Sequence, residues 1–136
     1  MTTNEHFFEW SSEFSVNHHA IDEQHQELIE ILNRLFLAVA ERQGHKVTLS
    51  VLDSLLNYTQ THFAYEEKVL REANYSDLEV HVQEHKQLGE ELNELVEKYM
   101  IEGTQIYFEL LRLLRKWLKK HIQGSDMNYR DLLAAR

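Results

Sequence analysis

Apolar residues recur at spacings of three and four along most of the chain, which is the period of an amphipathic α-helix. The connections between these periodic stretches are only a few residues long, and short connections favour antiparallel neighbours. The sequence therefore predicts an all-α fold, an antiparallel up-down-up-down four-helix bundle. The expected helices cover residues 19–42, 47–72, 77–101 and 105–122.

Local signals suggest where these helices begin and end. Gly44 is typical of the position just after a helix C-terminus and is expected to stop the first helix. Ser76-Asp77-Leu78-Glu79 matches a capping box at the start of the third. Gly124 is expected to interrupt the fourth helix, and residues 126–136 then form a short C-terminal helix.

The first 17 residues lack periodicity and form an N-terminal arm. The arm carries Phe7, Phe8, Trp10 and Phe14, and leaving so many aromatic rings in water would be costly. We therefore expect the arm to pack on the bundle. With 136 residues, the chain is expected to be one domain, residues 1–136.

Composition narrows the possible functions. The formal charge of −9 disfavours nucleic acid and anionic membranes as partners. The absence of cysteine excludes disulfides, thiolate metal sites and a thiol nucleophile. The sequence shows no secretory signal pattern and no apolar run long enough for a membrane span, so a cytoplasmic protein is the expectation.

Five histidines and two carboxylates lie in line with the apolar stripes of the predicted helices. Residues four apart on a helix present side chains side by side, which suits two ligands of one metal centre. Because the helices alternate in direction, the five histidines and Glu66 are expected within roughly 15 Å of the same bundle end. The seven candidate residues are His25, His62, Glu66, His81, His85, His121 and Asp126.

A lone histidine on an apolar face is more often a hydrogen-bonded core residue than a metal ligand. Five converging imidazoles with two carboxylates would bury several ionisable groups without countercharge unless metal is bound. We therefore predict a metal centre. The other histidines, His6, His18, His19 and His45, are expected at the surface.

The number of ligands points to two metal ions. Imidazole and carboxylate suit iron, manganese, zinc or copper, and a tetrahedral structural zinc would leave ligands unused. Two octahedral ions need twelve positions, of which five imidazoles, two bridging carboxylates and one bridging oxide or hydroxide fill all but one. A split of three and two imidazoles places the open position on the ion with two.

The sequence resembles the hemerythrins, in particular single-domain bacteriohemerythrins. The resemblance covers essentially the whole chain, and the combined motif is highly specific although each pair alone is weak. Asn17 departs from the glycine that many bacterial relatives have after Ser-Val. The matching segments are Trp10, Phe14-Ser15-Val16, Ile21 to His25, His62 to Glu67, His81 to His85, Trp117 to His121, and Asp126.

The resemblance implies a binding protein, not an enzyme, with two non-haem iron ions and a bridging oxo or hydroxo group. His81, His85 and His121 would hold one iron, His25 and His62 the other, and Glu66 and Asp126 would bridge them. Leu28 and Leu118, also expected as core leucines, would line the O2 pocket.

The implied function is reversible binding of O2, and of small anions such as azide, for carriage, storage or sensing. The alternatives are a di-iron oxidase or peroxidase, a protein handling nitric oxide or iron, and a bundle in which metal is purely structural.

Overall fold

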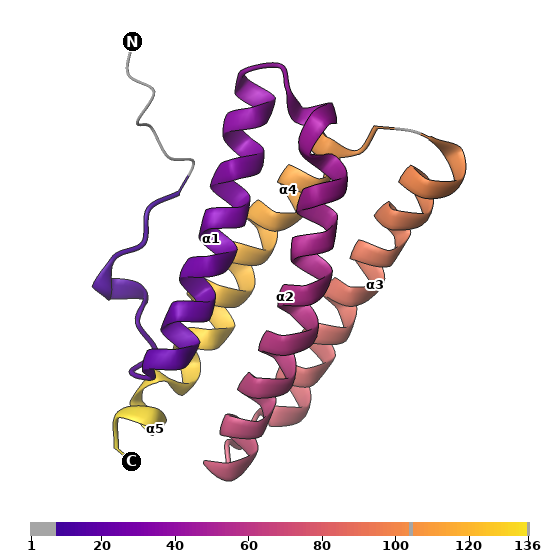
Figure 1. Ribbon diagram of the computed structural model, residues 1–136. Coiled ribbons are helices and arrows are strands. Elements are labelled where there is room, and N and C mark those ends of the chain that lie inside the picture. Colours follow the sequence, from indigo (N-terminus) through magenta and orange to yellow (C-terminus); the bar gives the residue numbers. More distant parts are fainter. Residues whose placement is uncertain (1–7, 104, 136) are drawn as a thin grey trace.

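The computed structural model describes residues 8–103 and 105–135 and shows four antiparallel helices (Figure 1). They are α1 (His19–Ala40), α2 (Gly44–Glu72), α3 (Leu78–Glu102) and α4 (Tyr107–Trp117). Helix α1 packs against α2 and α4, and α3 packs against the same two helices. The predicted all-α four-helix bundle is confirmed.

Gly124 does not interrupt the fourth helix, contrary to the prediction, and α4 already ends at Trp117. After α4 the chain continues through a π-helical segment, η2 (Leu118–Ser125), and a 3-10 turn, η3 (Asp126–Tyr129), into the short helix α5 (Arg130–Ala134). Gly124 lies inside η2. The chain therefore stays helical through Gly124, with a π-helical segment in place of the predicted break. The predicted C-terminal helix, α5, follows directly after η3.

Gly44 was also assigned the wrong role. Helix α1 ends at Ala40, Arg42 makes the turn with φ 60°, and Gly44 is the first residue of α2. A Cβ at Gly44 would lie 2.8 Å from Tyr107 Cδ1, so glycine is needed there for close packing between helices. The capping-box prediction was wrong as well, because Asp77 precedes α3 without a side-chain capping bond.

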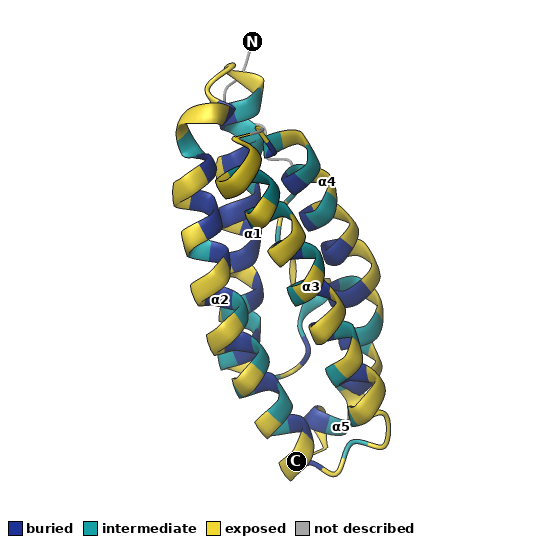
Figure 2. Ribbon diagram, turned by 90° about the vertical axis from the view of Figure 1, so that its right-hand side faces the viewer, coloured by how far each residue is buried: buried dark blue, intermediate teal, exposed yellow. Residues whose placement is uncertain are grey.

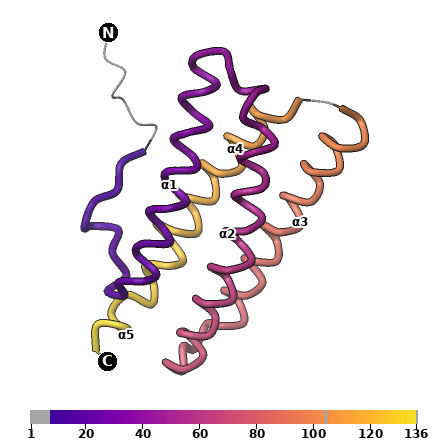
Figure 3. The backbone as a smooth tube through the Cα atoms, viewed as in Figure 1, coloured from indigo at the N-terminus to yellow at the C-terminus, as the bar shows by residue number. Residues whose placement is uncertain are grey.

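The N-terminal arm follows the outside of α1 in the direction opposite to that helix (Figure 3). Phe8 and Asn33 exchange two hydrogen bonds, of 2.9 and 2.8 Å, and Phe8 and Trp10 pack against the core. The arm contains one 3-10 turn, η1 (Ser12–Phe14). The expected packing is thus present from residue 8 onward, while Phe7 lies outside the described residues.

Buried residues lie on the inner face of each helix, and on α3 they extend no further than Leu92 (Figure 2). They make up two apolar clusters. The larger contains Leu28, Leu55, Leu88 and Leu118, and the smaller contains Ile21, Leu70 and Tyr129 near the chain ends. Along every helix the predicted ligands fall between residues of the two clusters, so they occupy a polar layer with apolar packing on both sides. None of the described helices has the length and apolarity of a bilayer span.

Candidate metal centre

The structure brings all seven predicted side chains together inside the bundle. His25 comes from α1, His62 and Glu66 from α2, and His81 and His85 from α3. The remaining two, His121 and Asp126, come from η2 and the first residue of η3. Each of the seven is at most 3 % exposed, so they share one dry interior.

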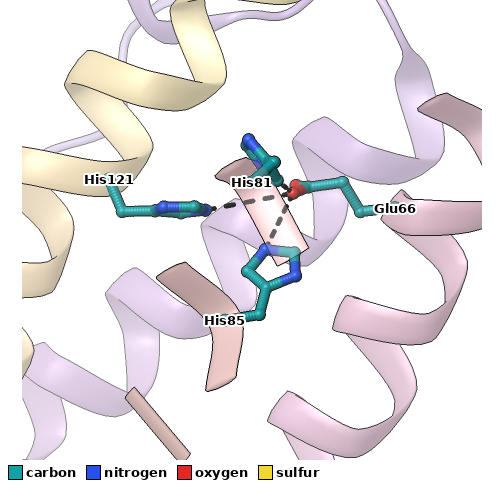
Figure 4. A group of neighbouring side chains, drawn as sticks. All are labelled: Glu66, His81, His85 and His121. Atoms are coloured by element: carbon teal, nitrogen blue, oxygen red, sulfur yellow. Dashed lines mark hydrogen bonds and ion pairs between the residues drawn. The ribbon is translucent and has the colours of Figure 1, made fainter. Parts of the chain in front are cut away.

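These side chains form two groups that share Glu66. In the first, which we call the three-imidazole group, ligand atoms of Glu66, His81, His85 and His121 all lie within 4.8 Å of one another. The imidazoles of this group point at the Glu66 carboxylate from three directions (Figure 4). The second, the two-imidazole group, consists of His25, His62, Glu66 and Asp126 at the same mutual distances.

Glu66 presents a different oxygen to each group. Its Oε1 contacts His81 Nε2 and lies 3.1 Å from His85 Nε2. Its Oε2 lies 3.1 Å from His62 Nε2 and 3.5 Å from His25 Nε2. Tyr129 donates a hydrogen bond of 3.1 Å to Oε2 and fixes this orientation. The carboxylate is therefore placed as a bridge between two centres.

Asp126 likewise presents a different oxygen to each group. Its Oδ1 lies 2.9 Å from His81 Nε2 and 3.0 Å from His121 Nε2. Its Oδ2 lies 2.9 Å from His25 Nε2. Two carboxylates thus each offer one oxygen to the three-imidazole group and one to the two-imidazole group.

Asp126 reaches this position because of the π-helical turn. Residues five apart differ by about 140° around an α-helix, so His121 and Asp126 would face different directions there. A π-helix has an i to i+5 hydrogen-bond pattern and brings such residues onto one face. The local backbone of η2 is therefore what allows both side chains to reach the same site.

The outer nitrogens of three imidazoles are held by hydrogen bonds. His62 Nδ1 lies 2.5 Å from Gln24 Oε1, His85 Nδ1 lies 2.7 Å from Glu67 Oε2, and His121 Nδ1 lies 2.9 Å from Glu84 Oε1. Because these oxygens accept, Nδ1 carries the proton and the Nε2 lone pair faces the interior. Such outer partners fix the tautomer of metal-binding histidines.

Several inner atoms have no hydrogen-bond partner. They include Nε2 of His25, His85 and His121 and both carboxylate oxygens of Asp126. Lone pairs of nitrogen and oxygen thus face each other across about 3 Å, an arrangement that is repulsive unless a proton or a cation lies between them. This donor set of imidazole and carboxylate fits a pair of transition-metal ions such as iron.

The charges in this interior shift the pKa values strongly. Burial lowers the pKa of His25, but the Asp126 and Glu66 carboxylates, whose oxygens lie 2.9 and 3.5 Å from its Nε2, outweigh burial and raise this pKa to about 9. The same carboxylates raise the pKa of His81 to about 9 and of His121 to about 10, again against burial. The metal-free chain therefore holds protons at positions where a cation would otherwise balance the carboxylates.

Aromatic rings stack on three of the imidazoles. Phe63 lies parallel to His85 with ring centroids 3.9 Å apart, and Trp117 stacks on His121 at the same distance. Tyr58 stacks on His62 at 5.0 Å. These rings restrict rotation of the imidazoles, a role that the sequence analysis assigned to none of the three.

The sequence analysis also missed the outer partners Gln24, Glu67 and Glu84. Each is adjacent in sequence to one of the seven residues, yet each resembles an ordinary polar surface residue. Among the other histidines, His19 and His45 are exposed as expected, and His6 lies outside the described residues. His18 instead is half-buried, where its Nδ1 accepts a hydrogen bond of 3.3 Å from the Ile21 amide and caps α1.

Leu28 and Leu118 are 2 % and 1 % exposed and belong to the same apolar cluster. They follow His25 and precede His121 by three residues, so each lies about one helical turn from a candidate ligand. Their placement agrees with an apolar wall above the polar layer, and their role toward O2 stays a prediction.

Known proteins of one family are similar to this chain in sequence and in fold. Residues 16–133 match the family model of the hemerythrin HHE cation binding domain. A bacteriohemerythrin of Stenotrophomonas maltophilia is 33 % identical over 93 % of this chain and 81 % of its own length. A bacteriohemerythrin of Pseudomonas aeruginosa is 30 % identical over 90 % of this chain and 78 % of its own.

The fold agrees with these matches. A crystal structure of an L114Y mutant of hemerythrin superposes with a TM-score of 0.81 at 26 % identity, covering 96 % of this chain and 99 % of that one. The family model covers most of the chain, and the matching region contains all seven residues of the site. The chain belongs to the hemerythrin family.

Proposed function

We propose that this protein binds O2 reversibly at a non-haem di-iron centre and serves in oxygen carriage, storage or sensing. Family membership supports the proposal, and the observation that carries it is the unequal division of ligands around two bridging carboxylates. When bound, a pair of ferrous ions supplies an open coordination position and the electrons that O2 takes up reversibly.

In this proposal His81, His85 and His121 would hold one iron, and His25 and His62 would hold the other. Glu66 and Asp126 would serve both ions, because each carboxylate presents one oxygen to each group. The two-imidazole group then lacks one ligand. A small molecule such as O2 or azide would bind on that side.

The apolar surroundings protect a reversible process. Leu28 and Leu118 lie in the large apolar cluster next to the site and keep water away from the open position. A dry wall disfavours protonation of the bound ligand and its irreversible loss. The hydrogen bonds from Gln24, Glu67 and Glu84 meanwhile hold the imidazoles in place as the ligand comes and goes.

An enzyme is the main alternative. Ferritin-like di-iron oxidases use carboxylate-rich sites with Glu-x-x-His pairs. Here five imidazoles face two carboxylates, and none of the five histidines has glutamate three residues before it. This ligand set favours reversible binding over oxidase chemistry.

Stopped-flow spectroscopy of the reduced, iron-loaded protein tests the proposal. We expect an absorbing oxygenated species that is stable for minutes and reverts under argon. Prompt conversion to the ferric form with continuous consumption of a reductant would instead indicate an enzyme. A centre that holds two irons yet responds to neither O2 nor azide would mean that the metal is purely structural.

A pair of leucine variants tests the apolar wall. Leu118→Ala would open space next to the site, and we expect at least tenfold faster oxidation of the oxygenated protein because water enters. Leu110→Ala makes the same change at a fully buried leucine two turns earlier and should leave the oxidation rate near that of the wild type. Equal oxidation rates for the two variants would show that Leu118 does not line the pocket.

A further inference from the structure

The hydroxyl of Tyr58 is a buried polar group that the proposed metal ligands do not explain. Tyr58 is 4 % exposed, and its Oη has no hydrogen-bond partner. Among the described residues, every other buried side-chain atom without a partner belongs to one of the seven candidate ligands. Leaving a buried hydroxyl without a hydrogen bond is costly, so its partner is expected to come from outside the chain.

Tyr58 lies on the side of the two-imidazole group. Its ring stacks on His62 with centroids 5.0 Å apart and an interplanar angle of 18°. The His62 ring in turn lies 5.1 Å from that of His25. Tyr58 also belongs to the apolar cluster that contains Leu28 and Leu118. It therefore shares the surroundings of the open position.

The protein itself offers this hydroxyl no free acceptor nearby. The Gln24 oxygen already accepts from His62, and Glu66 Oε2 already accepts from Tyr129. The remaining neighbours in the cluster are apolar and aromatic side chains, and no hydrogen bond joins any of them to the Tyr58 hydroxyl. Tyr129 shows the contrast, because the same phenol group one layer below has its partner within the protein.

We propose that Tyr58 donates a hydrogen bond to a small anionic ligand bound at the open position of the two-imidazole ion. The proposal rests on the proposed function and adds a residue that sets ligand affinity without contacting the metal. A hydrogen bond to a charged acceptor in a dry pocket is stronger than one between neutral groups. Anions with an exposed acceptor atom, such as azide, should benefit most.

The test is an azide titration of the oxidised, iron-loaded Tyr58→Phe variant, followed by its charge-transfer absorption. We expect about tenfold weaker azide binding than in the wild type, with two irons per chain retained. The metal-free variant should melt at the same temperature as the wild type or higher, because the change removes an unsatisfied hydroxyl. Tyr107→Phe, at the start of α4 and far along the bundle, is the matched control and should bind azide normally.

Unchanged azide affinity in Tyr58→Phe would overturn the proposal. So would iron loss or a lower melting temperature of the metal-free variant, since either would give the hydroxyl a structural role instead. If the wild type itself binds two irons but no azide, the open position is missing and the proposed function fails together with this one. Normal azide binding by the wild type and by both variants refutes the role of Tyr58 alone.

Discussion

Replacing Glu66 by alanine removes one of the two carboxylates that present an oxygen to each ligand group. Each of its oxygens lies within about 3 Å of imidazole nitrogens in a different group. After the change, the two-imidazole group keeps His25, His62 and one oxygen of Asp126. The three-imidazole group keeps its nitrogens and the other Asp126 oxygen, and therefore four ligands.

This difference sets the expected size of the effect. Four protein ligands can still hold one ion, whereas three with a single carboxylate oxygen hold the second ion weakly. We expect the iron content to fall from two per chain to one or fewer. In the metal-free chain, losing a fully buried carboxylate from among charged imidazoles should cost about 3 kcal/mol, or about 10 °C in melting temperature.

Metal analysis of the purified variants, with melting curves before and after iron loading, measures both effects. Glu67→Ala is the matched control, because Glu67 is the next residue and bonds only the outer nitrogen of His85. It should keep two irons, with metal affinity about 10- to 100-fold lower. Two irons per chain in Glu66→Ala would refute the assignment of Glu66 as a bridge.

Three further predictions concern the fold and its dependence on pH. Asn17 has φ 62° and donates a hydrogen bond of 3.1 Å to the Arg130 carbonyl. Asn17→Ala should therefore lower the free energy of unfolding by about 1–2 kcal/mol, and Asn17→Gly should lower it less. Equal urea midpoints for the alanine variant and the wild type would contradict this. Gly44→Ala should lower the free energy of unfolding in urea by about 1–3 kcal/mol, because its Cβ would meet the Tyr107 ring. Gly124→Ala should leave this free energy nearly unchanged, because the nearest atom to its Cβ would be 3.7 Å away. In the metal-free chain, the three imidazoles with pKa values of about 9 to 10 stabilise the fold fully below pH 6.5 and lose this effect as pH rises through 9 to 10. They outnumber the one imidazole whose pKa is lowered, so urea unfolding should show lower stability at pH 10 than at pH 6, and the reverse order would refute the charge assignment.

The sequence was sufficient to predict the bundle and the depth of six of the seven side chains. His62 with Glu66 and His81 with His85 are neighbours on the surface of an ordinary α-helix, and their apolar neighbours show which face is buried. Alternating helix directions then place them at one height. These arguments need only the period of the helix and its rise per residue.

Asp126 could not be placed in this way. Asp126 follows His121 by five residues, a spacing that puts the two on different faces of any α-helix. No residue pattern in Leu118 to Ser125 predicts the π-helical segment found there. The outer hydrogen bonds were equally hidden, because Glu67 and Glu84 have the composition of a solvated helix face. Their function depends on rotamers and on neighbouring helices, which a linear pattern does not specify.

The two sides of His85 and His121 explain why this polar layer belongs in the bundle. Their outer nitrogens are held by Glu67 and Glu84, whereas their inner nitrogens face carboxylate oxygens without hydrogen bonds. A buried network evolved only for stability would satisfy both sides, since each unpaired group is costly. Satisfaction on the outside alone is the arrangement expected of a site whose inner partner is a cation. Folding and metal binding should then be coupled in this layer, while the apolar clusters above and below it supply stability that does not depend on metal.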